Sequence, residues 1–161
     1  MSDQPANTPN FQVPRPWIQV AAFCQTALVE NTGQLSVVRI TDRVNIMGYT
    51  PQMQPQPLQL TMALLIKSGD MRGQYTLRLR VNSPNGQQTT SQETTLLFEG
   101  GDRGVQSVIP IAMVVGDIGT YWFDIMLEEE ILTRVPLTVL YQRIQLPPGS
   151  PPPLAEPPIG T

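Results

Sequence analysis

The 161-residue chain contains no histidine. Histidine is the commonest acid–base residue near neutral pH, the base of Ser-His-Asp and Cys-His catalysis, and a usual ligand of zinc and copper. Its absence excludes those catalytic systems and removes the usual ligand sets for those metals. The sequence therefore predicts a protein that is not an enzyme and that uses no cofactor or metal.

Cysteine is also nearly absent, because Cys24 is the single one and an internal disulfide is impossible. Its neighbours Ala22, Phe23 and Ala27 predict a small buried core residue rather than a nucleophile or redox thiol. The N-terminus lacks the basic and apolar regions of a secretory leader, and the longest apolar run, 105–115, is too short to span a bilayer. We therefore expect a cytoplasmic protein without a membrane partner.

Charge is scarce as well. Charged residues make up 14% of the chain, against about 25% in an ordinary globular protein. The 10 basic and 13 acidic residues give a net charge of −3. Binding to phosphates needs a clustered surplus of positive charge, so the composition argues against a nucleic-acid partner.

Proline, in contrast, is abundant, and its 17 residues divide the chain. Four precede Trp17 and seven follow Gln145, which predicts disordered proline-rich tails over 1–16 and 146–161 around a folded domain over 17–145. We expect extended polyproline II in the C-terminal tail. That tail is either an unpacked linker or a ligand for an aromatic groove in another protein.

The body of the chain has a period of two, in which apolar and polar residues alternate. Glycines fall between the alternating segments, and no segment combines helix caps with helical spacing. This pattern predicts an all-β fold, an antiparallel immunoglobulin-like β-sandwich of about seven to eight strands. The strands are expected over residues 18–29, 35–46, 58–66, 75–81, 94–98, 105–115, 121–127 and 131–141.

Three parts of the sequence resemble a family of small bacterial β-sandwich domains of unknown function. They are a hairpin with an Ile-x-Asp-Arg run (30–35 through 40–44), a Gly-x-Tyr-x-Leu strand before a Pro-Asn-Gly turn (73–79 and 84–86), and a Gly-x-Tyr-x-Phe-x-Ile strand before Val-Pro-Leu (119–125 and 135–139). The resemblance implies an immunoglobulin-like fold over most of 17–142 and lends no catalytic residues. One departure is Glu128–Glu130, where the family more often has a glycine-containing turn.

Outward-pointing apolar residues on the last two strands are the first candidate site. The alternation places Trp122, Met126 and Leu132 away from the core, with Leu140 extending the strip. An exposed strip of this kind marks an interface, unless a loop or tail covers it.

Arginines on a middle strand are the second candidate. Arg78 and Arg80 share one face, and Arg39, Arg43 and Arg134 have outward or ambiguous positions. If their strands are neighbours, these arginines line a sheet face that suits binding of carboxylates or phosphates. The alternative is a solvated face whose arginines pair with acids such as Asp42 and Glu93.

Two further groups of residues point to ordinary turns. The acids Asp117, Asp124 and Glu128–Glu130 are close in sequence, but strand geometry separates them, which predicts a solvated acidic hairpin tip rather than a calcium site. The segment 100–104 is rich in glycine but lacks the Gly-Lys-Ser/Thr ending of a phosphate loop, so it predicts a turn.

These observations lead to a non-enzymatic protein-binding or scaffolding module with a protein partner or a second copy of itself. The alternative is a small-ligand or carbohydrate-binding domain that uses Trp17, Tyr49 or Trp122 for stacking. A hydrolase with a carboxylate pair, such as Asp124 with Glu128 or Glu130, is disfavoured because a hairpin tip does not form a cleft.

Overall fold

The computed structural model describes residues 15–91 and 93–145, and these residues form eight β-strands. The all-β prediction is confirmed. In this part of the chain no helix has the length and apolar character needed to cross a membrane. The predicted tails lie outside the described residues, except for Arg15 and Pro16. The strands are β1 Trp17–Val29, β2 Leu35–Thr41, β3 Arg43–Gly48, β4 Gln56–Asn82, β5 Gln88–Thr90, β6 Thr94–Val115, β7 Gly119–Leu127 and β8 Glu130–Arg143.

The strands are hydrogen-bonded in the order β2-β1-β4-β7-β8-β3, and β5 and β6 also pair with β4. The prediction of antiparallel pairing is right except for β3 and β8, which run parallel. The predicted strand 35–46 is divided at Asp42, whose carbonyl accepts a hydrogen bond from Thr138 N at 3.0 Å. The chain crosses there from the edge beside β1 to the edge beside β8, and a crossover connection permits parallel pairing.

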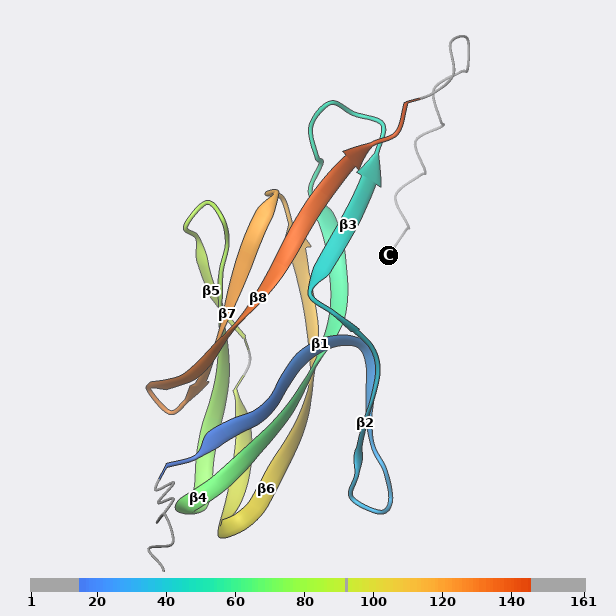
Figure 1. The fold of residues 1–161 in the computed structure, drawn as a ribbon. Helices are drawn as coiled ribbons and strands as arrows, with labels where there is room; N and C mark the ends of the chain where they lie inside the picture. Colours follow the sequence, from blue (N-terminus) through green and yellow to red (C-terminus); the bar gives the residue numbers. More distant parts are fainter. Residues whose placement is uncertain (1–14, 92, 146–161) are drawn as a thin grey trace, which may run out of the picture.

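The long strands β4 and β6 pair with each other and form a two-stranded ribbon that folds back on itself (Figure 1). The first half of β4 and its neighbour β1 belong to one layer of the sandwich, the first layer, and the second half of β4 and its neighbour β7 belong to the second layer. Residues 56–67 of β4 pair with 104–115 of β6, and residues 72–77 pair with 94–99. Between these stretches Gly69 lies opposite Gly101, and both have a positive φ that costs a glycine little. The glycines therefore bend the ribbon without ending it, and the prediction of four separate strands over these residues was wrong.

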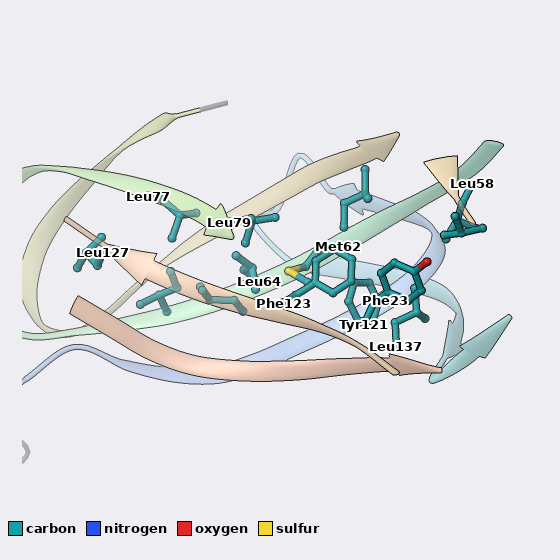
Figure 2. Packing of buried hydrophobic residues seen from close by; sticks show 14 of the residues in the cluster. Phe23, Leu58, Met62, Leu64, Leu77, Leu79, Tyr121, Phe123, Leu127 and Leu137 are labelled. Atoms are coloured by element: carbon teal, nitrogen blue, oxygen red, sulfur yellow. The ribbon is translucent and has the colours of Figure 1, made fainter. Parts of the chain in front are cut away.

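The core lies between the two layers (Figure 2). Phe23 of β1 stands beside the first half of β4, opposite Met62, whereas Phe123 of β7 stands beside the second half, opposite Val81. The rings of Phe23 and Phe123 nevertheless meet edge to face, because the ribbon brings the two halves of β4 together. Other buried members of this core are Leu58, Leu64, Ile66, Leu77, Leu79, Ile125, Leu137 and Val139.

Tyr121 fixes the start of β7. Its hydroxyl accepts a hydrogen bond from Asp117 N and donates one to Asp117 O, both at 3.2 Å. A tyrosine near the start of a strand that bonds back to the backbone a few residues upstream is the tyrosine corner of immunoglobulin-like sandwiches. This contact, together with the two packed layers, supports the predicted fold class.

The hairpin of β1 and β2 packs against the outside of the first layer. Its tip is fastened by Gln106 Nε2, which donates to Gly33 O at 2.7 Å. Beneath it Cys24 and Ala63 are fully buried, and Leu35 and Val37 pack against them. Burial raises the pKa of the Cys24 thiol. The prediction that Cys24 is a small core residue is confirmed.

Candidate functional site

The outer face of β7 and β8 carries an exposed tryptophan. Tyr121 and Phe123 point into the core, so Trp122 between them points outward, and it is 45% exposed. Trp122 lies opposite Pro136 of β8, and the exposed Leu140 follows on the same face of that strand. We call Trp122, Pro136 and Leu140 the outer strip.

Met126 and Leu132 do not belong to the outer strip, although the alternation predicted that they would. Met126 is 9% exposed and lies opposite Arg78. An irregularity in the pairing after Ile125 places Ile131, not Leu132, opposite Met126. Leu132 is therefore half-buried against the core, and Ile131 is the exposed residue of this pair.

Asp124 is a buried carboxylate beside the outer strip, with a side chain only 1% exposed. Its Oδ2 accepts hydrogen bonds from Arg80 Nε at 3.0 Å, Arg80 Nη2 at 2.7 Å and Asn82 Nδ2 at 3.3 Å. Its Oδ1 lies 2.8 Å from Arg134 Nε, which makes an ion pair without the alignment of a hydrogen bond. One carboxylate from β7 thus joins an arginine of β4 to an arginine of β8.

The electrostatics of this cluster favour the charged form of Asp124. Burial raises the pKa of its carboxyl, but the hydrogen bonds from Arg80 and Asn82 and the charges of Arg134 and Arg80 outweigh burial, so the pKa lies below its ordinary value. Two guanidinium groups on one carboxylate leave one net positive charge. Arg134, with a side chain 59% exposed, brings that charge to the surface.

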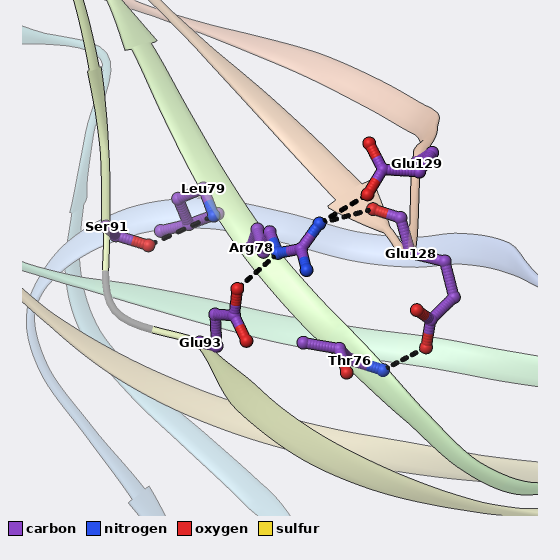
Figure 3. A network of polar contacts seen from close by, with 7 residues as sticks. All are labelled: Thr76, Arg78, Leu79, Ser91, Glu93, Glu128 and Glu129. Carbon is purple, nitrogen blue, oxygen red and sulfur yellow. Dashed lines mark hydrogen bonds and ion pairs between the residues drawn. The ribbon is translucent and has the colours of Figure 1, made fainter.

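Arg78 is neutralised by acids around it (Figure 3). Its Nε donates to Glu93 Oε1 and its Nη1 donates to Glu129 Oε1, both at 2.7 Å. The predicted pairing of arginines with Glu93 and Asp42 is confirmed, because Glu93 pairs with Arg78 and Asp42 pairs with its neighbour Arg43 at 3.1 Å. The structure therefore brings Arg78 and Arg80 to one face but assigns them different partners.

The three glutamates of the turn between β7 and β8 each have a separate partner. Glu128 has a positive φ of 52°, and its Oε1 accepts a hydrogen bond from Thr76 N at 2.6 Å. Glu129 pairs with Arg78, and Glu130 lies 3.2 Å from Arg15 Nη1. Within the described residues no group of three histidine, cysteine, aspartate or glutamate side chains is placed to hold a metal ion.

Two clefts lie away from the outer strip. One, of about 620 Å³, is bounded by the bend of β4 and the turn after β7, and its lining includes Met71, Tyr75, Leu127 and Leu132. The other, of about 350 Å³, is lined by Tyr49, Arg143, Ile144 and Gln145.

The three predicted stacking residues do not share a site. Tyr49 lines the smaller cleft, Trp122 stands on the outer face, and the half-buried Trp17 begins β1 opposite Lys67.

The sandwich and its tyrosine corner define an immunoglobulin-like β-domain. The sequence matches a family of unknown function, DUF6941, over residues 19–140, and the chain belongs to that family. Among solved structures it is similar to an immunoglobulin-like protein from Pseudomonas aeruginosa, with 12% identity, a TM-score of 0.36, and coverage of 78% of this chain and 96% of that chain. Among curated proteins, none matches. The family match confirms the predicted resemblance to a family of unknown function, and the two packed layers with the tyrosine corner support its immunoglobulin-like fold.

Proposed function

We propose that this domain is a non-enzymatic protein-binding or scaffolding module whose binding surface is the outer face of β7 and β8. The exposure of Trp122 on a regular strand carries the proposal. Tryptophan is among the residues most enriched at the energetic centres of protein interfaces, where it fills a pocket of the partner. Its free surface here supplies apolar area that a partner would remove from water.

The rigidity of this surface supports a binding role. Phe123 and Tyr121 anchor β7 in the core on both sides of Trp122, and Asn82 Nδ2 donates to Trp122 O at 3.3 Å. A backbone that is already ordered loses little conformational freedom on binding, so more of the contact energy remains as affinity. The nearby acids support a binding rather than a hydrolytic role, because Asp124, Glu128 and Glu129 are each held by their own hydrogen bonds.

The test compares the wild-type chain with Trp122→Ser and with Leu97→Ser, which removes an exposed apolar residue from β6. Light scattering gives the mass in solution, and quantitative mass spectrometry gives the proteins recovered with each variant from an extract of the native host. We expect Trp122→Ser to lose a self-associated form or a specific co-purifying protein, and Leu97→Ser to behave as wild type. Identical mass and recovery for all three proteins would rule out this surface.

The larger cleft supports a second candidate, a small-ligand site. Met71, Tyr75, Leu127 and Leu132 give it an apolar lining, and Glu130 lies at the same cleft. A panel of glycans and small cationic or apolar compounds would be tested for its effect on the melting temperature. A compound that stabilises the wild type but not Glu130→Gln would support this site, and a panel without any stabilising compound would contradict it.

A further inference from the structure

The inference concerns the chemistry of the partner and rests on the proposed function above. We propose that the outer face recognises a segment of a partner protein in which an aspartate or glutamate lies close to an apolar side chain. The carboxylate binds Arg134, with Arg80 beside it, and the apolar side chain packs on Trp122.

Two adjacent rows of side chains on the outer face provide this arrangement. The register places Arg80, Asp124 and Arg134 in one row across β4, β7 and β8. The next row on the same face contains Asn82, Trp122 and Pro136. Neighbours on one face of a strand are about 7 Å apart, so a cationic row and an aromatic row lie within reach of a single short peptide.

The positive charge of the first row faces outward. Asp124 is buried beneath the two arginines, whereas the Arg134 side chain is largely exposed. A guanidinium group has five N–H donors. Arg134 directs Nε to Asp124, and within the described residues its two terminal amino groups donate no hydrogen bond. Those groups form the fork that binds a carboxylate in bidentate geometry.

The acids around the row favour a carboxylate over a polyanion. Glu93 and Glu129 neutralise Arg78, which is the next residue on the same face of β4. The area of exposed positive charge is therefore small, and the further phosphates of a polyanion would be repelled by the glutamates beside it. A single carboxylate fits this area, and an apolar neighbour of that carboxylate would meet Trp122.

Asp124 acts as a positioning residue for the two arginines. A free arginine side chain loses rotamer entropy when a bound partner fixes it. The contacts from Arg80 and Arg134 to one buried carboxylate fix both side chains before a partner arrives. The arginines are thus held in a geometry that is ready to bind.

A random linear peptide library displayed on phage tests the proposal, with the full chain as the immobilised protein. We expect enriched peptides in which an acidic residue lies within a few positions of an aromatic or aliphatic one. The affinity of an enriched peptide should fall by about tenfold or more in Arg134→Gln, because a charge-assisted bidentate contact is lost. Arg103→Gln, which removes an exposed arginine paired with Glu99 on β6, is the matched control and should bind as wild type.

The outcomes separate this inference from the proposed function. Peptides that depend on Trp122 but show no acidic preference, or bind Arg134→Gln normally, would overturn the acidic specificity and leave the binding surface intact. A library without any enriched peptide would also overturn it. If Trp122→Ser in addition leaves mass and partner recovery unchanged, the proposed function fails with it.

Discussion

The ring of Phe23 contacts the ring of Phe123 edge to face, with centroids 4.7 Å apart. The two side chains come from opposite layers, and both are almost completely buried. Phe123 follows the tyrosine-corner residue Tyr121 by two positions, where antibody domains carry the second cysteine of their inter-sheet disulfide. With a single cysteine in the chain, an aromatic pair occupies this place between the layers.

The stability of the sandwich should therefore depend strongly on this pair. We expect Phe123→Ala to lower the free energy of unfolding by about 3–5 kcal/mol, because it removes buried apolar area and leaves a cavity between the layers. Its neighbour Trp122 is exposed, and Trp122→Ala should cost less than about 1 kcal/mol. Chemical denaturation of both variants is the measurement, and equal losses would contradict the assignment of Phe123 to the core.

The layers of this fold could be predicted from the sequence, but the joining of the strands could not. The apolar stripe of the first half of β4 is even-numbered (Leu58, Leu60, Met62, Leu64 and Ile66), whereas the apolar residues from Tyr75 to Val81 are odd-numbered. This change of parity is the sequence signal of the bend, yet the glycines within it resemble the ends of strands. The parallel pairing of β3 with β8 depends on where the chain crosses in space, which alternation does not encode.

The same limit applies to the candidate site. The outward position of Trp122 follows from the period of two and was predicted correctly. The position of Leu132 was not, because one irregularity in strand pairing reverses the faces that follow it. The contact between Arg80 and Asp124 depends on the register of two strands far apart in sequence, so no pattern within either strand indicates it.

The buried carboxylate should make part of the stability dependent on pH. The pKa of Asp124 is lower in the folded protein than its ordinary value of about 3.9, so its contribution is present above that pH and is lost as the pH falls through the folded pKa. We expect Asp124→Asn to lower the free energy of unfolding at neutral pH by about 1–3 kcal/mol. The difference from wild type should shrink below about pH 4.

Denaturation across a pH series checks this expectation. The control is Asp42→Asn, because the pKa of Asp42 is also lowered, by hydrogen bonding to Arg43 and by its charge, but the pair is exposed. Its effect at neutral pH should be clearly smaller. A constant difference between Asp124→Asn and wild type down to strongly acidic pH would show that the ionised carboxylate is not the source.

The turn between β7 and β8 should prefer glycine to alanine at its first position. Glu128 has a positive φ, which costs a non-glycine residue about 1 kcal/mol, and its carboxylate bonds Thr76 N. Glu128→Ala loses the hydrogen bond and keeps the strain, so we expect a loss of about 1–2 kcal/mol. Glu128→Gly loses the bond but relieves the strain and should cost less. Thermal unfolding of the two variants gives the order of their stabilities, and a glycine variant less stable than the alanine variant would contradict this prediction.

The reactivity of Cys24 should report the opening of the β1–β2 hairpin. Burial raises the pKa of this thiol, so in the folded protein it is protonated and shielded at neutral pH. We expect labelling by a disulfide reagent to be slow in the native protein and fast in denaturant. Gln106→Ala removes the hydrogen bond to Gly33 O, worth about 1 kcal/mol, and should accelerate native labelling about fivefold. The control is Gln87→Ala, which lies in the separate turn before β5 and should leave the labelling rate unchanged, because local opening of the hairpin and not thiol chemistry limits the reaction. If Gln87→Ala accelerated labelling as much as Gln106→Ala, opening of the β1–β2 hairpin would not be the step that exposes Cys24.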